Sequence, residues 1–471
     1  MKILFINPPF TQYGGVEGQG GKSTPLNLAY LASYLIGKGY NNVRILDAEA
    51  QELPYKDICS VVKKVNPDIV AMTLPTPVFD QVQTLSVMFK KINPKIKIIV
   101  GGPHPSALPK QTLNDTVIDY LILGEGELTI YELVKELEKI KPNLKKIDGI
   151  AYRSKNNQII ITNKRKLIKD LDSIPFPARH LLPYHLYFAP PTKRVSNFNG
   201  TSMVSSRGCP YECTYCVSAV VWGRGCRFRS ANSVVDEMEE CVKKYNLAEF
   251  NFHDDLFTVN EKRVLDICNE IQRRKLNVAW VCMARVDRIT PKMLKAMKRA
   301  GCGKIVFGFE SGSQKVLNLM KKHTTPKQAI KAVKMVKKAG IKSAGNFMLG
   351  NLGETKKTIR ETINLAKKLN TDTIAFFQTS PYIGTELYDT AIKKGYLKKN
   401  IKWKDYAVLS NNPPALELPG LSSKEVAKYV RKAYLEYYLN PAYIFSKIIS
   451  LKNTRDIKNL FEGAKILLKI T

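Results

Sequence analysis

Short apolar runs alternate with segments of helical length from residue 1 to about residue 140. The runs are residues 3–6, 43–48, 68–74, 97–102 and 120–127, and segments such as residues 25–39 carry apolar side chains at helical spacing between them. This alternation is typical of a parallel α/β sheet. It predicts a Rossmann-like N-terminal domain over residues 1–148, with any ligand bound beyond the carboxyl ends of its strands.

A second alternation begins near residue 201, with apolar runs at residues 202–208, 249–255, 280–285, 304–311, 342–350 and 373–381. Six β/α units in succession predict a partial (β/α)6 barrel of the TIM type over residues 201–420, with its chemistry on the loops at the carboxyl ends of the strands. Between the two domains, residues 149–162 are typical of a β-hairpin. The irregular, proline-rich stretch after the hairpin completes a connecting segment over residues 149–200.

Residues 421–471 have no strand signal and alternate Lys and Arg with Tyr, Ile and Leu at helical spacing. The predicted fold is therefore α/β with a helical C-terminal region. A basic amphipathic helix suits an anionic membrane surface. This motivates the hypothesis of a peripheral contact with the inner face of the membrane, and core packing of the same side chains is the alternative.

Composition narrows the class of protein. The 471 residues exceed one ordinary core, and nine cysteines at irregular spacing do not form a secreted disulfide framework. No stretch approaches the roughly 20 apolar residues of a membrane span, so we expect a cytoplasmic protein with reduced thiols. The net charge of +33 fits either an acidic partner or lysines on solvated helix faces, and we expect no nucleic-acid partner.

The sequence GQGGKST at residues 18–24 resembles a phosphate-binding loop. That motif requires a glycine at position 16, where Val16 stands. The sequence therefore argues against nucleotide hydrolysis, and a flexible glycine loop that approaches a large ligand is the expected use.

Three cysteines lie within eight residues in RGCPYECTYC, namely Cys209, Cys213 and Cys216. A zinc site needs four ligands, usually as two close pairs, and no fourth cysteine or histidine stands at a suitable spacing. Three thiolates on one loop instead suit a cubane iron-sulfur cluster whose fourth iron is open to a substrate or cofactor.

This CxxxCxxC loop after the first strand of a six-unit barrel resembles the radical S-adenosylmethionine (SAM) superfamily, and Tyr215 is the aromatic residue that typically precedes the third cysteine. With NPP at residues 7–9, GGPH at residues 101–104 and GEGE at residues 124–127, the chain is similar to the cobalamin-dependent branch of that superfamily. The resemblance implies a 4Fe-4S cluster on the three cysteines that cleaves SAM to a 5'-deoxyadenosyl radical. It also implies a cobalamin that carries a methyl group.

The resemblance suggests SAM contacts from Tyr215, Glu310, Arg285 and Asp254. For Glu310 the alternative is a loop carboxylate without a ligand, and for Arg285 it is a structural salt bridge. FHDD stands at residues 252–255 in place of the usual GGE, so Asp254 or Asp255 either binds SAM or substrate, or only caps the chain. The segment SPYIGTELY at residues 380–388 resembles the closing PxxGT segment of the family.

For cobalamin, the resemblance suggests contacts from the loops after the third, fourth and fifth strands: Thr73, Gly101, Gly102, Pro103, His104, Gly124 and Glu125. For His104 a structural role in loop packing is the alternative. The sequence lacks the DxHxxG motif of histidine-ligated cobalamin, so we expect no histidine as the lower cobalt ligand. The six remaining cysteines form no second cluster motif, which argues against the methylthiotransferases of transfer RNA.

The predicted activity is methylation of an unactivated carbon. The alternative keeps the cofactors but makes another bond, by cyclisation, rearrangement or carbon-carbon coupling on a lipid, isoprenoid or tetrapyrrole. A non-catalytic cobalamin sensor is the third and least favoured class. The expected partners are a small-molecule or lipid substrate and a reductant such as flavodoxin or ferredoxin.

Overall fold

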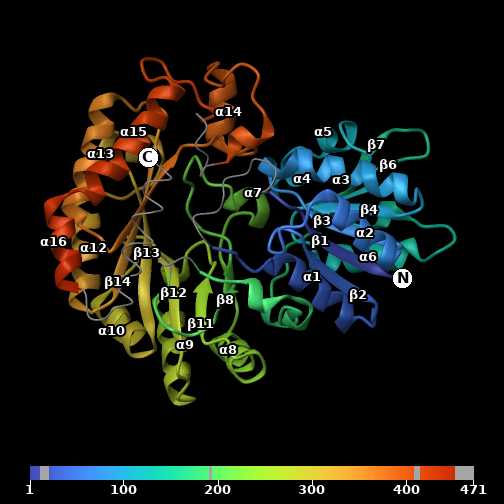
Figure 1. Cartoon of the computed structure of the whole chain (residues 1–471), viewed down its shortest axis with the longest axis horizontal. Helices are drawn as coiled ribbons and strands as arrows, with labels where there is room; N and C mark the ends of the chain where they lie inside the picture. The colour runs from blue at the N-terminus through green and yellow to red at the C-terminus, as the bar shows by residue number, and fades with distance from the viewer. Residues whose placement is uncertain (11–20, 190–193, 408–413, 451–471) are drawn as a thin grey trace.

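The computed structural model describes residues 1–10, 21–189, 194–407 and 414–450. These residues form two sheets of mainly parallel strands, and helices cover both faces of the first (Figure 1). Residues 18–20 of the glycine loop singled out in the sequence (residues 18–24) lie outside the described residues, as do residues 451–471 of the C-terminal region. No helix among the described residues is long and apolar enough to span a membrane.

The N-terminal sheet has the strand order β2-β1-β3-β4-β5-β6-β7. Its parallel strands are β1 (Ile3–Asn7), β2 (Val43–Asp47), β3 (Ile69–Thr73), β4 (Lys97–Gly101) and β5 (Tyr120–Ile122). The order reverses between β1 and β3, which is the point where α/β sheets of this kind bind ligands. The Rossmann-like parallel sheet predicted from the sequence is confirmed.

Side chains alternate between the two faces of this sheet, and each face has its own core. Ile3 and Phe5 pack against α1 (Leu26–Gly37) and α6 (Glu127–Leu137), whereas Leu4 and Ile6 pack against α2 (Tyr55–Val65) and α3 (Phe79–Ile92). Burial on both faces explains why these strands read as continuous apolar runs. Two short helices, α4 (Pro103–Ala107) and α5 (Pro109–Asn114), follow β4.

The predicted hairpin is present as β6 (Ile150–Arg153) and β7 (Ile159–Ile161). It pairs antiparallel with β5 and extends the N-terminal sheet, where the sequence had assigned it to the connecting segment. The connecting segment proper therefore begins after residue 161.

The second domain is a partial barrel of six parallel strands in the order β15-β14-β13-β12-β11-β8. The strands are β8 (Gly200–Met203), β11 (Glu249–Phe252), β12 (Ala279–Ala284), β13 (Cys302–Glu310), β14 (Lys342–Leu349) and β15 (Thr373–Gln378). The helices are α7 (Ser218–Trp222), α8 (Ala231–Tyr245), α9 (Glu261–Arg273), α10 (Pro291–Arg299), α11 (Gln314–Leu319), α12 (Pro326–Lys338), α13 (Lys356–Leu369) and α14 (Glu386–Lys393). The predicted partial barrel is confirmed.

Two helices complete the described chain, α15 (Ser423–Tyr438) and α16 (Pro441–Ser450). α15 packs on α13 and β15, and tyrosine hydroxyls fix it there. The hydroxyl of Tyr437 donates to the carbonyl of Thr371 at 2.6 Å, and that of Tyr434 accepts from the amide of Phe376 at 3.0 Å. The described part of the C-terminal region is helical, as predicted.

The two domains meet where α4 of the first packs against α7 of the second, and Figure 1 shows both helices between the two sheets. α4 follows β4, and α7 follows the cysteine motif. The domain contact therefore lies beside the loops that the sequence marks as functional.

Candidate active site

The predicted cluster ligands lie between two short antiparallel strands, β9 (Ser206–Arg207) and β10 (Arg227–Phe228). This stretch, residues 208–226, is called the cysteine segment below, and it carries Cys209, Cys213 and Cys216. Gly208 opens it with φ +88°, and a side chain there would overlap the carbonyl oxygen of Gly225. Because only glycine allows so close an approach of two backbones, the segment leaves β9 in a tight turn.

The three cysteines are partly exposed and their thiols are free. Burial raises the pKa of Cys209, and it raises that of Cys216 to about 11. Charge on Cys213 raises the pKa of both further, so a cation is needed to hold Cys209 and Cys216 as thiolates.

Among the described residues, no three His, Cys, Asp or Glu side chains converge on one metal ion. A cubane needs no such convergence, because each thiolate binds a different iron. The three thiols on one segment therefore fit a cluster better than a single ion.

Glu310 ends β13 in the left-handed backbone region, with φ +63°. A residue other than glycine pays of order 1–3 kcal/mol for this conformation, and the pairing of β13 with β14 is irregular between Gly308 and Glu310. Such an irregularity redirects a side chain. The carboxylate Oε1 accepts hydrogen bonds from the Tyr215 hydroxyl at 3.0 Å and from the Lys322 ammonium at 2.8 Å. Glu310 and Tyr215, both predicted to contact SAM, are thus brought together.

Lys322 is a site residue that the sequence did not reveal. Its side chain is buried, and its ammonium also donates to the Tyr215 hydroxyl at 3.1 Å. Burial by itself lowers the pKa of Lys322, but attraction to Glu310 and to Cys213 outweighs it and raises the pKa above its usual value. A positive charge is therefore kept beside the cysteine segment. In the sequence nothing distinguishes Lys322 from its exposed neighbour Lys321.

The side chain of Arg285 makes its contacts within the barrel domain. Its guanidinium binds the Asp287 carboxylate at 3.0 and 3.3 Å and donates to the carbonyl of Lys322 at 2.7 Å. It also stacks on Tyr211 of the cysteine segment, with Cζ 3.6 Å from the ring centroid. The salt bridge considered as the alternative for Arg285 is present, and its contact with SAM stays a prediction.

Asp254 and Asp255 support the cysteine segment from the end of β11. Asp254 is fully buried and accepts from the Ser205 amide at 2.7 Å and from the hydroxyls of Ser205 and Ser206 at 2.6 Å. Asp255 accepts from the amide of Gly208 at 3.0 Å. Both carboxylates therefore cap backbone at the start of the segment, and a contact of Asp254 with SAM is an untested prediction.

The residues predicted to contact cobalamin line the carboxyl edge of the N-terminal sheet. Thr73 ends β3 and pairs with Gly101, which ends β4. Gly102 has φ +118°, and a side chain there would crowd the backbone of Leu74 at 3.2 Å. A side chain at Gly124 would meet nothing closer than the carbonyl oxygen of Val221, at 3.9 Å. This open edge of short residues suits a large ligand that lies against the backbone.

Pro103 begins α4, and His104 follows it with no exposed surface. The two ring nitrogens of His104 are hydrogen-bonded to the Thr76 hydroxyl at 3.2 Å and to the Gln111 amide oxygen at 3.0 Å. Burial lowers the pKa of His104, so the ring is neutral. The ring packs against Trp403 of a 3-10 turn (Trp403–Tyr406), with ring centroids 5.0 Å apart. These contacts correspond to the structural role that was the alternative for His104.

Glu125 is engaged by arginines of the other domain. Its carboxylate binds Arg207 at 2.9 Å and Arg227 at 2.9 Å, and it also accepts from the amide of Ile168 at 2.8 Å. Neither arginine was singled out from the sequence, although Arg207 stands directly before the cysteine motif. The predicted cofactor contact of Glu125 is not tested by these bonds.

The PxxGT segment touches both domains. Gly384 has φ +83°, and a side chain there would meet Val220 of α7 at 3.2 Å and Ala107 of α4 at 3.4 Å. The Thr385 hydroxyl then caps α14 by accepting from the amide of Tyr388 at 3.3 Å. The segment therefore packs where the two domains meet.

The sequence matches two family profiles. Residues 17–134 match the B12 binding domain, and residues 203–366 match the radical SAM superfamily. The chain is 36% identical to an uncharacterized methyltransferase of Pyrococcus horikoshii over 95% of both chains. It is 29% identical to the anaerobic magnesium-protoporphyrin IX monomethyl ester cyclase of Rubrivivax gelatinosus, over 94% of this chain and 78% of the cyclase.

The fold resembles that of a solved structure. The radical S-adenosylmethionine methyltransferase TsrM from Kitasatospora setae, with cobalamin and a [4Fe-4S] cluster bound, superimposes with a TM-score of 0.71 at 17% identity, covering 92% of this chain and 85% of TsrM. At this identity the likeness concerns the fold, and it includes both domains.

Proposed function

Because the chain belongs to the cobalamin-dependent radical SAM enzymes, we propose that it is a methyltransferase that acts on an unactivated carbon. One observation carries the proposal: the arginines that flank the three-cysteine segment of the barrel domain are bonded directly to the Gly124–Glu127 loop of the B12 binding domain. A cluster bound by the cysteine segment and a cobalamin bound by the Gly124–Glu127 loop would face the same active site. The relative from Pyrococcus horikoshii is also named a methyltransferase.

When bound, the cluster supplies the electron that splits SAM into methionine and a 5'-deoxyadenosyl radical, and cobalamin supplies the methyl group. The protein side chains bind and orient these groups. Cys209, Cys213 and Cys216 hold the cluster, and the Lys322 ammonium balances their negative charge. The bonds of Glu310 to Tyr215 and Lys322 use Oε1, so its other carboxylate oxygen would be the one to accept a hydrogen bond from a ribose hydroxyl of bound SAM.

We infer that His104 would not serve as the lower cobalt ligand of a bound cobalamin. His104 is the histidine nearest to the predicted cobalamin loops in sequence, and its two nitrogens are committed to Thr76 and Gln111. Its buried ring packs against both Phe79 and Trp403, with ring centroids 4.9 and 5.0 Å away. Ligation by His104 would break these contacts, which supports a lower face without this imidazole.

The second candidate function keeps both cofactors but closes a ring or couples carbons on a lipid, isoprenoid or tetrapyrrole. The 29% identity to a tetrapyrrole cyclase over 94% of this chain favours keeping it. The substrate is in either case a small molecule or a lipid. The electron comes from a flavodoxin or ferredoxin, and the net charge of +33 would attract such acidic carriers.

A lipid substrate would be reached through the C-terminal helices. Leu439, Phe445, Ile448 and Ile449 are 62%, 67%, 58% and 67% exposed at the end of α15 and on α16. On α15 four of the five exposed residues that precede them are cationic, namely Lys424, Lys428, Arg431 and Lys432, and the fifth is Leu435. Apolar side chains beside a row of cations match an anionic membrane surface, so we propose peripheral docking there.

Vesicle binding tests the docking. The wild type should sediment with vesicles of phosphatidylglycerol and phosphatidylcholine but not with phosphatidylcholine alone, and Phe445→Ser with Ile448→Ser should abolish sedimentation. Ile140→Ser is the matched control, because Ile140 is fully exposed on the N-terminal domain. Equal binding of the double variant and the wild type would refute the docking surface.

Anaerobic reconstitution with iron, sulfide and hydroxocobalamin tests the enzymatic proposal. Wild type should bind a cluster and cobalamin, cleave SAM, and transfer labelled methyl from SAM to an acceptor. Cys213→Ala should lose the cluster and SAM cleavage but keep cobalamin. If the enzyme cleaves SAM and converts a substrate, but the product carries no labelled methyl group, the result would favour cyclisation or carbon-carbon coupling, which is the second candidate function. A cluster without cobalamin would exclude methyl transfer through cobalt.

A further inference from the structure

The two ends of the cysteine segment are tied to one carboxylate of the N-terminal domain. Arg207 and Arg227 face each other as paired residues of β9 and β10. The guanidinium of Arg207 lies 2.9 Å from Glu125 Oε1, and that of Arg227 lies 2.9 Å from both oxygens of Glu125. The three cysteines stand between these two arginines in the sequence.

A second carboxylate fixes the direction of the first arginine. One terminal nitrogen of Arg207 binds Glu125, and the other binds Glu127 at the start of α6. A guanidinium is planar and rigid, so two separate carboxylates define its orientation as well as its position. Its faces are also covered, with Cζ 5.7 Å from the Tyr30 ring centroid and 5.1 Å from that of Trp222.

The network is too deeply buried to be a stabilising surface contact. The side chains of Glu125, Glu127 and Arg207 are 2%, 6% and 6% exposed, and that of Arg227 is 16% exposed. Removing such charges from water costs several kcal/mol per ion, and apolar residues of similar volume often stabilise as well or better. The best-attested use of a buried ion network is to fix one register between two elements.

We propose that Glu125 and Glu127 set the position of the cysteine segment against the N-terminal sheet, so that Glu125, Glu127, Arg207 and Arg227 are positioning residues for the spacing between cluster and cobalamin. This inference rests on the proposed function, since it requires both cofactors. The residues act through the segment that they hold, and no contact with a cofactor is needed.

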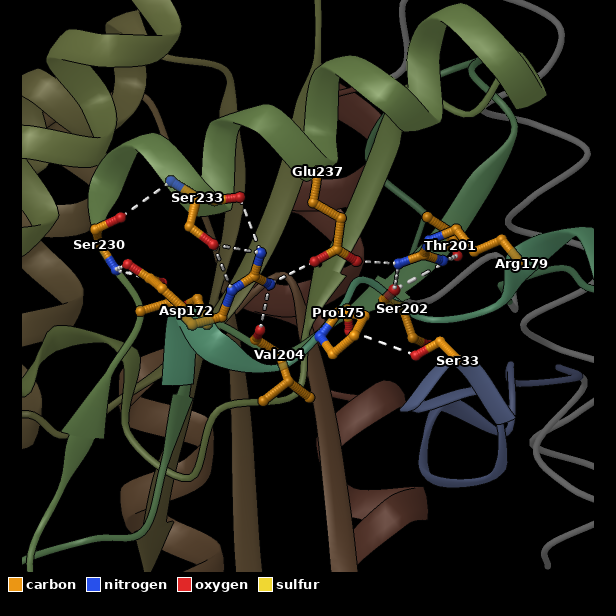
Figure 2. Close-up of polar contacts among 12 residues, drawn as sticks. Ser33, Asp172, Pro175, Arg179, Thr201, Ser202, Val204, Ser230, Ser233 and Glu237 are labelled. Atoms are coloured by element: carbon orange, nitrogen blue, oxygen red, sulfur yellow. Dashed lines mark hydrogen bonds and ion pairs between the residues drawn. The ribbon is translucent and has the colours of Figure 1, made fainter. Parts of the chain in front are cut away.

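The chain offers a control of the same chemistry elsewhere in the domain contact. Glu237 of α8 also binds two arginines: Arg179 of the connecting segment at 2.6 Å, and Arg229. It is 1% exposed, and Figure 2 shows its carboxylate beside the guanidinium of Arg179. Arg179 and Arg229 also donate to the carbonyls of Ser202 and Val204, at 3.0 and 3.1 Å. This network holds the connecting segment on the barrel and makes no bond to Glu125 or Glu127 in the described residues.

The test uses the full chain reconstituted with iron, sulfide and hydroxocobalamin. The dipolar coupling between the reduced cluster and cobalt(II) reports their separation. Cofactor content and thermal midpoint are measured alongside for wild type, Glu125→Gln, Arg207→Lys and Glu237→Gln. Arg207→Lys keeps the positive charge but cannot bind both carboxylates through two separate terminal nitrogens. It therefore provides a milder variant if Glu125→Gln folds poorly.

Glu125→Gln and Glu237→Gln should lower the thermal midpoint similarly, and both should keep full cofactor content. Only Glu125→Gln and Arg207→Lys should change the dipolar coupling, by the amount expected when the distance between cluster and cobalt changes by about 1 Å. The same two variants should lose turnover roughly 100-fold. An unchanged coupling in both would overturn the inference, and so would selective loss of cobalamin from Glu125→Gln, which would make Glu125 a direct contact. Failure of the wild type to bind both cofactors would instead refute the proposed function.

Discussion

Lys322 and Glu310 form a buried ion pair beside the cysteine segment, with Nζ 2.8 Å from Oε1 and each side chain 9% exposed. Removing one partner leaves the other charge buried without compensation. We therefore expect Lys322→Met to lower the free energy of unfolding of the apoprotein by about 3–5 kcal/mol. Urea denaturation measures this loss.

The neighbouring residue supplies the control for this prediction. Lys321 pairs with Glu386 on the surface, where the two side chains are 45% and 51% exposed. Lys321→Met should cost less than about 1 kcal/mol. Equal losses for the two variants would show that Glu310 is not left as an uncompensated buried charge when Lys322 is removed.

The second prediction concerns His104. His104→Phe keeps a ring packed against Phe79 and Trp403 but leaves Thr76 and Gln111 without their partner, so the free energy of unfolding should fall by about 1–3 kcal/mol. Cobalamin content should be unchanged. The electron paramagnetic resonance spectrum of the cobalt(II) form should lack splitting from an imidazole nitrogen in wild type and variant alike. A nitrogen splitting that only the variant loses would identify His104 as the lower ligand.

Sequence periodicity was sufficient to predict the parallel strands of both large sheets, because strands buried on both faces are largely apolar. It did not reveal that the hairpin β6–β7 joins the N-terminal sheet. The cysteine motif was equally clear, because its ligands are adjacent in sequence. Lys322 and Arg207 could not be recognised as site residues from the sequence. A lysine or arginine occupies the same polar position in the hydrophobic pattern whether its side chain is solvated or buried in an ion pair. Their roles depend on partners that the local pattern does not reveal, such as Glu125, which lies 82 residues from Arg207.

The third prediction concerns the turn that reaches back to the N-terminal domain. The Trp403 ring lies 5.0 Å from the rings of both Phe79 and His104. Each such aromatic pair contributes about 0.5–1.5 kcal/mol beyond burial. Trp403→Ala should therefore speed amide hydrogen exchange in residues 403–407 by roughly 5- to 150-fold, which corresponds to the loss of about 1–3 kcal/mol.

Phe445→Ala is the matched control for Trp403→Ala, because Phe445 is 67% exposed. It should leave exchange in residues 403–407 unchanged. If Trp403→Ala also leaves it unchanged, the turn is held by its other contacts, such as that of the Tyr406 carbonyl with the Ser380 hydroxyl at 3.0 Å.

The fourth prediction is a pH dependence that arises at Glu354, between β14 and α13. Burial raises the pKa of Glu354 from 4.5 to about 7, although its Oε2 accepts from the amides of Gly350 and Asn351 at 2.5 and 3.0 Å. Its Oε1 is buried and has no hydrogen-bond partner among the described residues. The folded protein therefore favours the neutral acid.

Between these two pKa values the folded protein keeps a proton that the unfolded chain has lost, so the free energy of unfolding falls as the pH rises. A difference of 2.5 pKa units (7 − 4.5) corresponds to about 3 kcal/mol. Glu354→Gln cannot ionise, and urea denaturation from about pH 5 to about pH 8 should show that it lacks this part of the slope. Glu386→Gln, on the exposed end of α14, should keep the slope of wild type. If the free energy of unfolding of the wild type changes over this interval by the same amount as that of Glu354→Gln, the prediction is wrong. Glu354 would then be ionised in the folded protein, because its two amide bonds outweigh its burial.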